Sequence, residues 1–411
     1  MAKRHPAEVT GRHRRSFRSQ ILHAAPVIVL ITAVTAVADR QWHLLDSFHF
    51  FALDTFVATA APESGDVVIV NISDDDYRQT FKSRSPLNPR PLQELIDSVL
   101  KQSPAVVGID ISTADADDAP LLGHYERTTT PIVWVRDAFA LDASAARTQT
   151  WQLDSVLGAQ NPPAGIRTGL SLFPRDADRF VRGYYRHVPL KTTDGDIAPA
   201  SFAWAIVQTF CSSPAGARNT MCTALLDRER QQPGDAGEHE LLRFNFAGDR
   251  YTFRKVPATT VAAAPPGLFA NAIVLVGGTF AAARDFYATP FGPMAGVELT
   301  ALAVESELKG GGITAANEIL MIVMDLVAGV VLVWLLWRWT PGSKSHALLA
   351  SAAILACAFA GSYVAFRGFG YWASFVPVGA GVWLHQLYDR AHDAREIRKE
   401  LEECRKRLGS L

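Results

Sequence analysis

Four apolar stretches interrupt the mixed polar pattern of this chain, and they are Ile21–Ala38, Ile319–Trp337, Ala347–Phe366 and Trp372–Leu387. Each has about 16 to 20 residues, close to the roughly 20 that a helix needs to cross a 30 Å hydrocarbon core. We therefore predict an α-helical membrane bundle with one N-terminal and three C-terminal spans.

Basic residues gather near both ends of the chain and between the second and third stretches. The leader, residues 1–20, holds six Lys and Arg, and residues 388–411 hold seven. Arg338 and Lys344 separate the second and third stretches. By the positive-inside rule both termini lie in the cytoplasm, and residues 39–318 lie outside. We expect a multi-pass inner-membrane protein that contacts membrane lipid and carries a large periplasmic domain.

The first stretch has a second interpretation, as a cleaved signal sequence. Ala36, Val37 and Ala38 resemble a small-residue cleavage site. Either interpretation places residues 39–318 across the membrane.

The charge of the exported segment excludes one class of partner. Residues 39–318 hold 24 Lys and Arg against 33 Asp and Glu, a net charge of −9. Since nucleic acid is polyanionic, such a surface argues against a nucleic-acid partner.

Short β-branched runs alternate with helical patterns inside the exported segment. The runs 67–72, 105–111, 131–135 and 272–277 are almost entirely apolar, as buried parallel strands are. Helical patterns occupy 91–101, 199–210 and 297–308, and an antiparallel strand pair is predicted around Arg182–Lys191. The sequence predicts an α/β sandwich.

Two of the four cysteines lie in the exported segment. Cys211 and Cys222 are 11 positions apart, and the intervening loop contains no His, Asp or Glu that would complete a metal site. In an oxidising compartment we expect them to form a disulfide.

Seven segments carry a resemblance to a known family. They are VVIVNISDDD (67–76), PRPLQELID (89–97), AVVGIDI (105–111), LRFNFAG (242–248), AIVLVGGTF (272–280), RDFYATP (284–290) and AGVELTA (295–301). In this order they resemble the extracellular sensory domain of the second CHASE type, over roughly Leu44–Leu308. The resemblance implies an input domain between one membrane helix and three, associated with a cyclase or a histidine kinase.

The chain departs from that family pattern in two ways. Only residues 388–411 follow the last predicted span, so we expect a stand-alone form without a fused output domain. Thr300 stands where the family often has His after the Gly-Val-Glu run. We therefore transfer no ligand from relatives to this chain.

Acidic residues follow two of the predicted strands. Asp74 and Asp75 come after the first strand, and Asp110 ends the second. Ligands of open α/β sheets bind beyond the carboxyl ends of the strands, so both groups could line one crevice and hold a ligand or a hard cation. The alternative is that these residues are local caps and turn residues, with Asp110 as the exception because a carboxylate at a buried strand end needs a partner.

A second strand-end loop adds further candidate ligand-binding residues. Gly277, Gly278 and Thr279 follow the last buried strand, and Arg284 and Asp285 come shortly after. Such a loop suits an anion or a small polar ligand, although Arg284 and Asp285 could also form a structural ion pair.

The tail, residues 388–411, continues a helical pattern that is typical of a helix paired with another helix. Apolar residues from Leu384 to Leu411 recur at spacings of three and four, which is typical of a coiled coil and favours a homodimer. An amphipathic helix on the membrane surface is the alternative.

No catalytic motif or metal-ligand spacing is present in the sequence, so we expect no enzymatic activity, no metal and no cofactor. The leading hypothesis is a sensor that detects a ligand or a periplasmic protein and acts on a separate cytoplasmic signalling protein. The alternative is a scaffold whose exported domain docks an envelope protein without signalling.

Overall fold

The computed structural model describes most of the chain, in two compact units. The described residues are 17–59, 67–114, 119–126, 128–140, 151–154, 156, 166–231, 239–244, 246–247, 250–251, 253–338 and 344–408. One unit is Asp54–Ala315, here called the α/β unit. The other comprises Met1–Leu53 and Ala316–Leu411 and is called the helical unit.

A six-stranded parallel sheet forms the centre of the α/β unit. Its order is β13 (Arg254–Pro257), β1 (Val67–Ile72), β14 (Ile273–Gly278), β2 (Val106–Asp110), β3 (Ile132–Arg136) and β6 (Arg167–Leu170). The four central strands are the apolar runs that the sequence predicted, and parallel strands read this way because both faces are covered.

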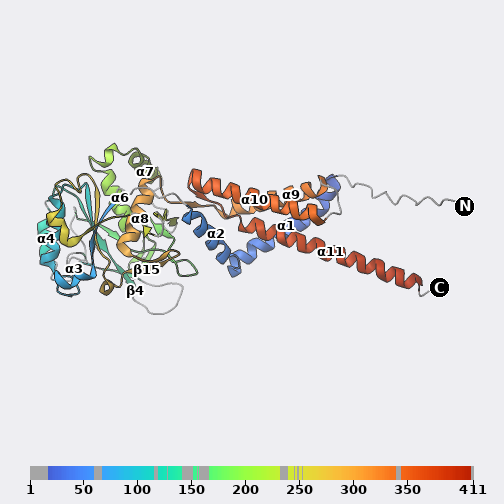
Figure 1. Cartoon of the computed structure of the whole chain (residues 1–411), viewed down its shortest axis with the longest axis horizontal. Helices are drawn as coiled ribbons and strands as arrows, with labels where there is room; N and C mark the ends of the chain where they lie inside the picture. The colour runs from blue at the N-terminus through green and yellow to red at the C-terminus, as the bar shows by residue number, and fades with distance from the viewer. Residues whose placement is uncertain are drawn as a thin grey trace. The chain divides into compact units, whose positions relative to one another are not determined.

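Helices cover both faces of this sheet, which makes a three-layer sandwich (Figure 1). On one face, α4 (Pro89–Leu100) places Leu92, Leu95, Ile96 and Val99 against the sheet, at the three- and four-residue spacing of one helix face. On the other face lie α6 (Phe202–Cys211) and α8 (Gly296–Leu308). The α/β class predicted from the sequence is confirmed.

The remaining elements of the α/β unit are short. They are α2 (Asp46–Ala58), which begins in the helical unit, α3 (Asp74–Gln79), α5 (Ala119–Tyr125), α7 (Thr220–Gln231), the 3-10 helices η2 (Gly216–Arg218), η3 (Ala258–Ala263) and η4 (Ala281–Ala283), and the strands β4 (Ala138–Ala140), β5 (Trp151–Leu153), β7 (Gly183–Tyr185), β8 (Leu190–Thr192), β9 (Gly195–Ile197), β10 (His239–Leu241), β11 (Phe246–Ala247), β12 (Arg250–Tyr251), β15 (Phe286–Thr289), β16 (Gly292–Ala295) and β17 (Thr314–Ala315).

The antiparallel pair predicted within Arg182–Lys191 is wrong. β7 pairs with β10, about 55 residues further along the chain, and β8 pairs with β9. The sequence pattern around β7 indicates a strand. It carries no local signal that its partner, β10, lies so far along the chain.

A disulfide joins the end of α6 to the start of α7. The Cys211 and Cys222 sulfurs are 2.02 Å apart, and both residues are buried. The pairing expected from the sequence is present in the structure.

Four helices make up most of the helical unit: α1 (Phe17–Trp42), α9 (Glu318–Arg338), α10 (Lys344–Phe369) and α11 (Val376–Leu408). A short strand, β18 (Tyr371–Trp372), lies between the last two. Three of them, α9, α10 and α11, share a core of Leu332, Ala350, Ile354, Val378 and Val382. Each predicted span coincides largely with one helix, except that the last helix begins four residues later than predicted, where the Ser374 hydroxyl accepts a hydrogen bond from the Val376 amide.

Among the described residues, one helical stretch is both long and apolar enough to cross a bilayer, and it is Leu348–Phe369. The apolar stretches Ala25–Asp39 and Ile319–Leu335 are shorter. The bundle of four spans is therefore not confirmed and stays a prediction for the other three helices. The leader, residues 1–20, lies largely outside the described residues.

Candidate functional site

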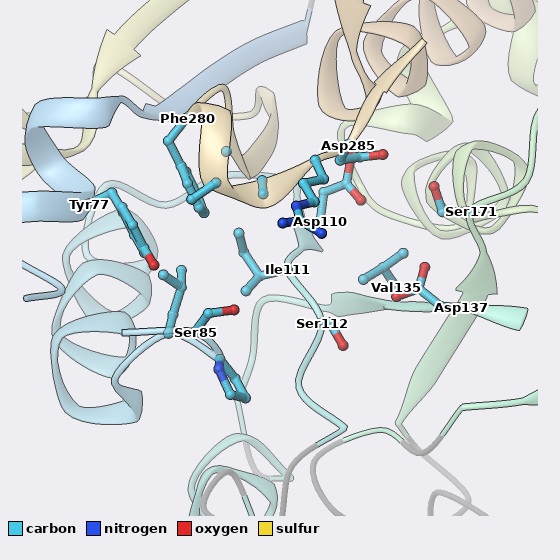
Figure 2. Close-up of a pocket in the computed structure, with 16 residues that line it drawn as sticks. Tyr77, Ser85, Asp110, Ile111, Ser112, Val135, Asp137, Ser171, Phe280 and Asp285 are labelled. Carbon is cyan, nitrogen blue, oxygen red and sulfur yellow. The ribbon is translucent and has the colours of Figure 1, made fainter. Parts of the chain in front are cut away.

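A cavity of about 420 Å³ opens at the edge of the sheet where β14, β2, β3 and β6 end. Figure 2 shows the side chains around it. Its lining comes from five connecting segments and comprises Tyr77, Ser85, Pro86, Leu87, Asp110, Ile111, Ser112, Val135, Asp137, Ser171, Gly278, Phe280, Ala282, Ala283, Arg284 and Asp285. This is the crevice in which ligands of open α/β sheets bind, and its volume lies within the usual range of small-molecule pockets.

Three aspartates reach the cavity because three strands end at the same level. Asp110 is the last residue of β2 and is level with Gly277 of β14. Asp137 directly follows β3, which pairs with β2. Asp285 lies in the loop after β14. The parallel register therefore gathers carboxylates that are up to 175 positions apart in the sequence.

A glycine at the start of α8 lets the Asp285 carboxylate lie against the helix. A Cβ at Gly296 would come within 2.0 Å of Asp285 Oδ2, so any other residue here would displace the carboxylate. Asp285 accepts hydrogen bonds from Tyr287 and from the Gly296 amide. The N-terminal end of a helix favours a negative charge, so α8 holds Asp285 in place.

The pKa values of all three carboxyl groups are raised, in each case chiefly by burial. Burial raises the pKa of Asp110 well above its ordinary range, and the charges of Asp285 and Asp137 raise it further. Burial, with the charges of Asp154 and Asp285, raises the pKa of Asp137 to about 6. Burial raises the pKa of Asp285 despite its hydrogen bonds. The site thus holds more acidic than basic groups, since Arg284 is the only basic residue in its described lining.

Asp110 has an oxygen that the described residues leave poorly hydrogen-bonded. Its Oδ2 atom is buried and no described residue donates a well-formed hydrogen bond to it, although the Thr300 hydroxyl lies near the carboxylate and lowers its pKa in part. A buried polar atom without a partner costs free energy, and such atoms are uncommon in folded proteins. Asp110 was the acidic residue that the sequence marked as needing a partner.

The opposite wall of the cavity is apolar. Tyr77 and Phe280 stack with their ring centroids 4.5 Å apart, and Ile111 and Leu87 lie in the same lining. In Figure 2 the aromatic pair is drawn on the other side of Ile111 from the carboxylates. The cavity therefore offers one charged wall and one apolar wall to a ligand.

Four of the residues predicted from the sequence line this cavity, and they are Asp110, Gly278, Arg284 and Asp285. The suggested ion pair between Arg284 and Asp285 is absent, although the structure describes both residues, because the carboxylate of Asp285 is held by Tyr287 and Gly296 instead. Arg284 adopts a left-handed backbone conformation with φ 54°.

The other predicted residues have local structural contacts and do not line the cavity. Asp74 accepts a hydrogen bond from the Ala281 amide at 3.0 Å, and Asp75 forms an exposed ion pair with Arg78. Thr279 donates to Asn71 Oδ1 at 2.8 Å. A Cβ at Gly277 would come within 2.5 Å of Val297, so this glycine allows α8 to pack closely. For Asp74 and Asp75 the alternative interpretation as cap and turn residues describes these contacts.

Sequence reasoning missed Asp137 and Ser171. Both come immediately after sheet strands, so the same strand-end rule that selected Asp110 would have found Asp137 had it been applied to the predicted strand 131–135. Ser171 follows β6, a short strand that was not predicted.

Comparison with known proteins gives one family. The model of the CHASE2 domain matches residues 27–339, which is most of the chain. Neither a curated protein sequence nor a solved structure matches it.

Proposed function

The chain belongs to the CHASE2 domain family, whose members are extracellular sensory domains, and we propose that it is a membrane-anchored sensor. In this proposal the α/β unit lies in the periplasm and binds its signal in the cavity at the carboxyl edge of the sheet. The helical unit anchors the chain and passes the signal to a separate cytoplasmic protein.

The observation that carries this proposal is the cavity itself. It is an open pocket of about 420 Å³ that brings three carboxylates together, and Asp110 contributes to it a buried oxygen without a well-formed hydrogen bond from a described residue. Groups with strongly shifted pKa values in a cleft are typical of functional sites.

The membrane anchor is supported by composition and charge. Leu348–Phe369 has the length and hydropathy of a span, and large apolar side chains of α9 and α10 are exposed, among them Ile319, Leu348 and Phe359. Lipid would cover these side chains.

The tail supports a relay. α11 continues as one helix from Val376 to Leu408, and its residues Ile397, Leu401 and Leu408 are exposed. A second copy of the helix would bury this stripe in a coiled coil, which makes the homodimer part of the proposal.

A first experiment tests the topology in intact cells. The exposed turn residue Asp194 is changed to Cys in a chain whose free Cys357 and Cys404 are Ser. We expect a membrane-impermeant maleimide to label this site, and a chain with only Cys404 restored to stay unlabelled until the membrane is opened. Labelling of Cys404 alone in intact cells would contradict the proposed orientation.

A second experiment tests sensing with the full-length protein in lipid nanodiscs. The melting temperature is measured with and without the low-molecular-mass fraction of periplasmic extract. We expect the fraction to raise it for the wild type and for Asp194→Trp, and to have no effect on Ser171→Trp, which fills the cavity. An unchanged wild type, or an equal rise in Ser171→Trp, would contradict a signal site in this cavity, and the scaffold alternative would then be preferred.

A further inference from the structure

We infer that the cavity binds a small organic cation, an ammonium or guanidinium group on a short apolar body, with Asp110, Asp137 and Asp285 around its charge. This inference rests on the proposed function and adds the chemical class of the signal.

The charge of the lining favours a cation. Three carboxylates and one guanidinium, that of Arg284, give a formal charge of −2 when all are ionised. The structure records no ion pair between a basic side chain and any of the three carboxylates, within the ranges that it describes. A bound cation would supply the compensation that the protein lacks.

The buried oxygen of Asp110 specifies a hydrogen-bond donor. Oδ2 is closed to solvent and accepts no well-formed hydrogen bond from a described residue, and the nearby Thr300 hydroxyl offsets only part of the rise in the pKa of Asp110. A carboxylate oxygen accepts the N–H of an ammonium or guanidinium group, and such a charge-assisted hydrogen bond is shorter and stronger than a neutral one. An anionic or purely apolar ligand would leave the cost of burying Asp110 unrelieved.

The shape of the site disfavours a bare metal ion. Among the residues with described positions, no three acidic, His or Cys side chains are arranged to hold one ion. The cavity is also far larger than an ion, and Tyr77, Phe280 and Ile111 give it an apolar wall. Hydrocarbon would be buried against these side chains while the charged group meets the carboxylates.

Binding should depend on pH with a definite sign. Burial raises the pKa values of all three carboxyl groups, that of Asp137 to about 6, so acidic pH favours their protonated forms in the empty site. A cation must displace those protons. We therefore expect its affinity to increase as the pH rises from about 5 to about 7.5.

Isothermal titration calorimetry of the full-length protein in nanodiscs tests the inference with three probes of equal chain length. Putrescine carries two ammonium groups, butane-1,4-diol is neutral, and succinate is an anion. We expect putrescine to bind at least about tenfold more tightly than either of the others at about pH 7.5. Asp110→Asn should weaken putrescine binding at least about tenfold, and Asp194→Asn, a change of the same kind in an exposed turn, should have no effect.

The variant needs a check that it folds. Asp110→Asn keeps the size of the side chain and removes a poorly compensated buried charge, so its melting temperature should equal or exceed that of the wild type. Retained folding with lost binding supports the inference. If Asp110→Asn melts lower, Asp285→Asn replaces it, with the same expectation for binding.

The outcomes separate this inference from the proposed function. Tighter binding of succinate, equal binding of all three probes, or undiminished putrescine binding in the folded variants would overturn the organic cation. Absence of putrescine binding together with a periplasmic extract that stabilises the wild type but not Ser171→Trp would overturn it as well, while the sensor proposal would stand.

Discussion

Replacement of Asp137 by Asn should stabilise the protein at neutral pH and not at acidic pH. Burial, with the charges of Asp154 and Asp285, raises the pKa of Asp137 from 3.8 to about 6. The folded state therefore keeps this proton to a higher pH than the unfolded state does. The contribution of Asp137 to the free energy of unfolding is therefore largest below about pH 4. This contribution is lost as the pH rises through about 6.

The size of the effect follows from the same two pKa values. A tenfold difference in proton affinity corresponds to about 1.4 kcal/mol, so the ionised carboxylate lowers the free energy of unfolding by about 3 kcal/mol at pH 7.5. Asn has nearly the same shape and no charge, and it removes this loss. For a domain of this length we expect the melting temperature to rise by about 5 to 10 °C at pH 7.5 and to change little at pH 4.

Thermal unfolding of the full-length protein in nanodiscs, followed by near-UV circular dichroism, measures this difference. Trp134 and Trp204 are fully buried in the α/β unit and report on its packing. Asp194→Asn serves as the control and should follow the wild type at every pH. A melting temperature for Asp137→Asn that equals the wild-type value at both pH 4 and pH 7.5 would show that Asp137 is ordinarily solvated, and the electrostatic account of the cavity would be wrong.

Three further predictions concern the disulfide, α8 and the tail. Cys211→Ser with Cys222→Ser should lower the free energy of unfolding by about 3 kcal/mol, since the bond closes a loop of about 12 residues, and labelling of both wild-type thiols without reductant would contradict the bridge. Glu307→Gln should lower the melting temperature, because it weakens buried hydrogen bonds worth about 1.5 to 3 kcal/mol, without changing putrescine affinity; an unchanged melting temperature would contradict this. Leu401→Pro should abolish oxidative crosslinking of the tail through exposed Cys404, and crosslinking equal to the wild type would exclude the coiled coil.

The sequence predicted the cavity through one general rule and missed parts of it through incomplete use of that rule. Almost entirely apolar runs identified the four central strands, and the strand-end position of Asp110 placed it in the crevice. Asp285 was also found, because it follows the last buried strand closely. Asp137 obeys the same rule, so its omission was not a limit of the sequence.

Other features had no local signal. The neighbours of each strand depend on the whole sheet, and β14 lies between β1 and β2 although about 160 residues of chain separate it from the latter. The close contact of Asp285 with Gly296 depends on where α8 packs. Asp74 and Asp75 follow a sheet strand as Asp110 does, but α3 begins at Asp74 and directs them into local contacts. Sequence position alone does not distinguish these cases.

Helix α8 connects the cavity to the segment that leads out of the α/β unit. Its first residue, Gly296, lies against the Asp285 carboxylate, and near its other end the fully buried Glu307 accepts hydrogen bonds from Tyr184 and Arg186 at 2.8 and 2.7 Å. A helix of 13 residues is about 20 Å long, and a helix fixed by buried contacts at both ends moves as one body. The chain continues from α8 toward Glu318, where α9 begins. A ligand that moves Asp285 would therefore act first on α8, and loss of the Glu307 contacts should weaken the link between the cavity and the crosslinking of Cys404 while leaving ligand binding intact.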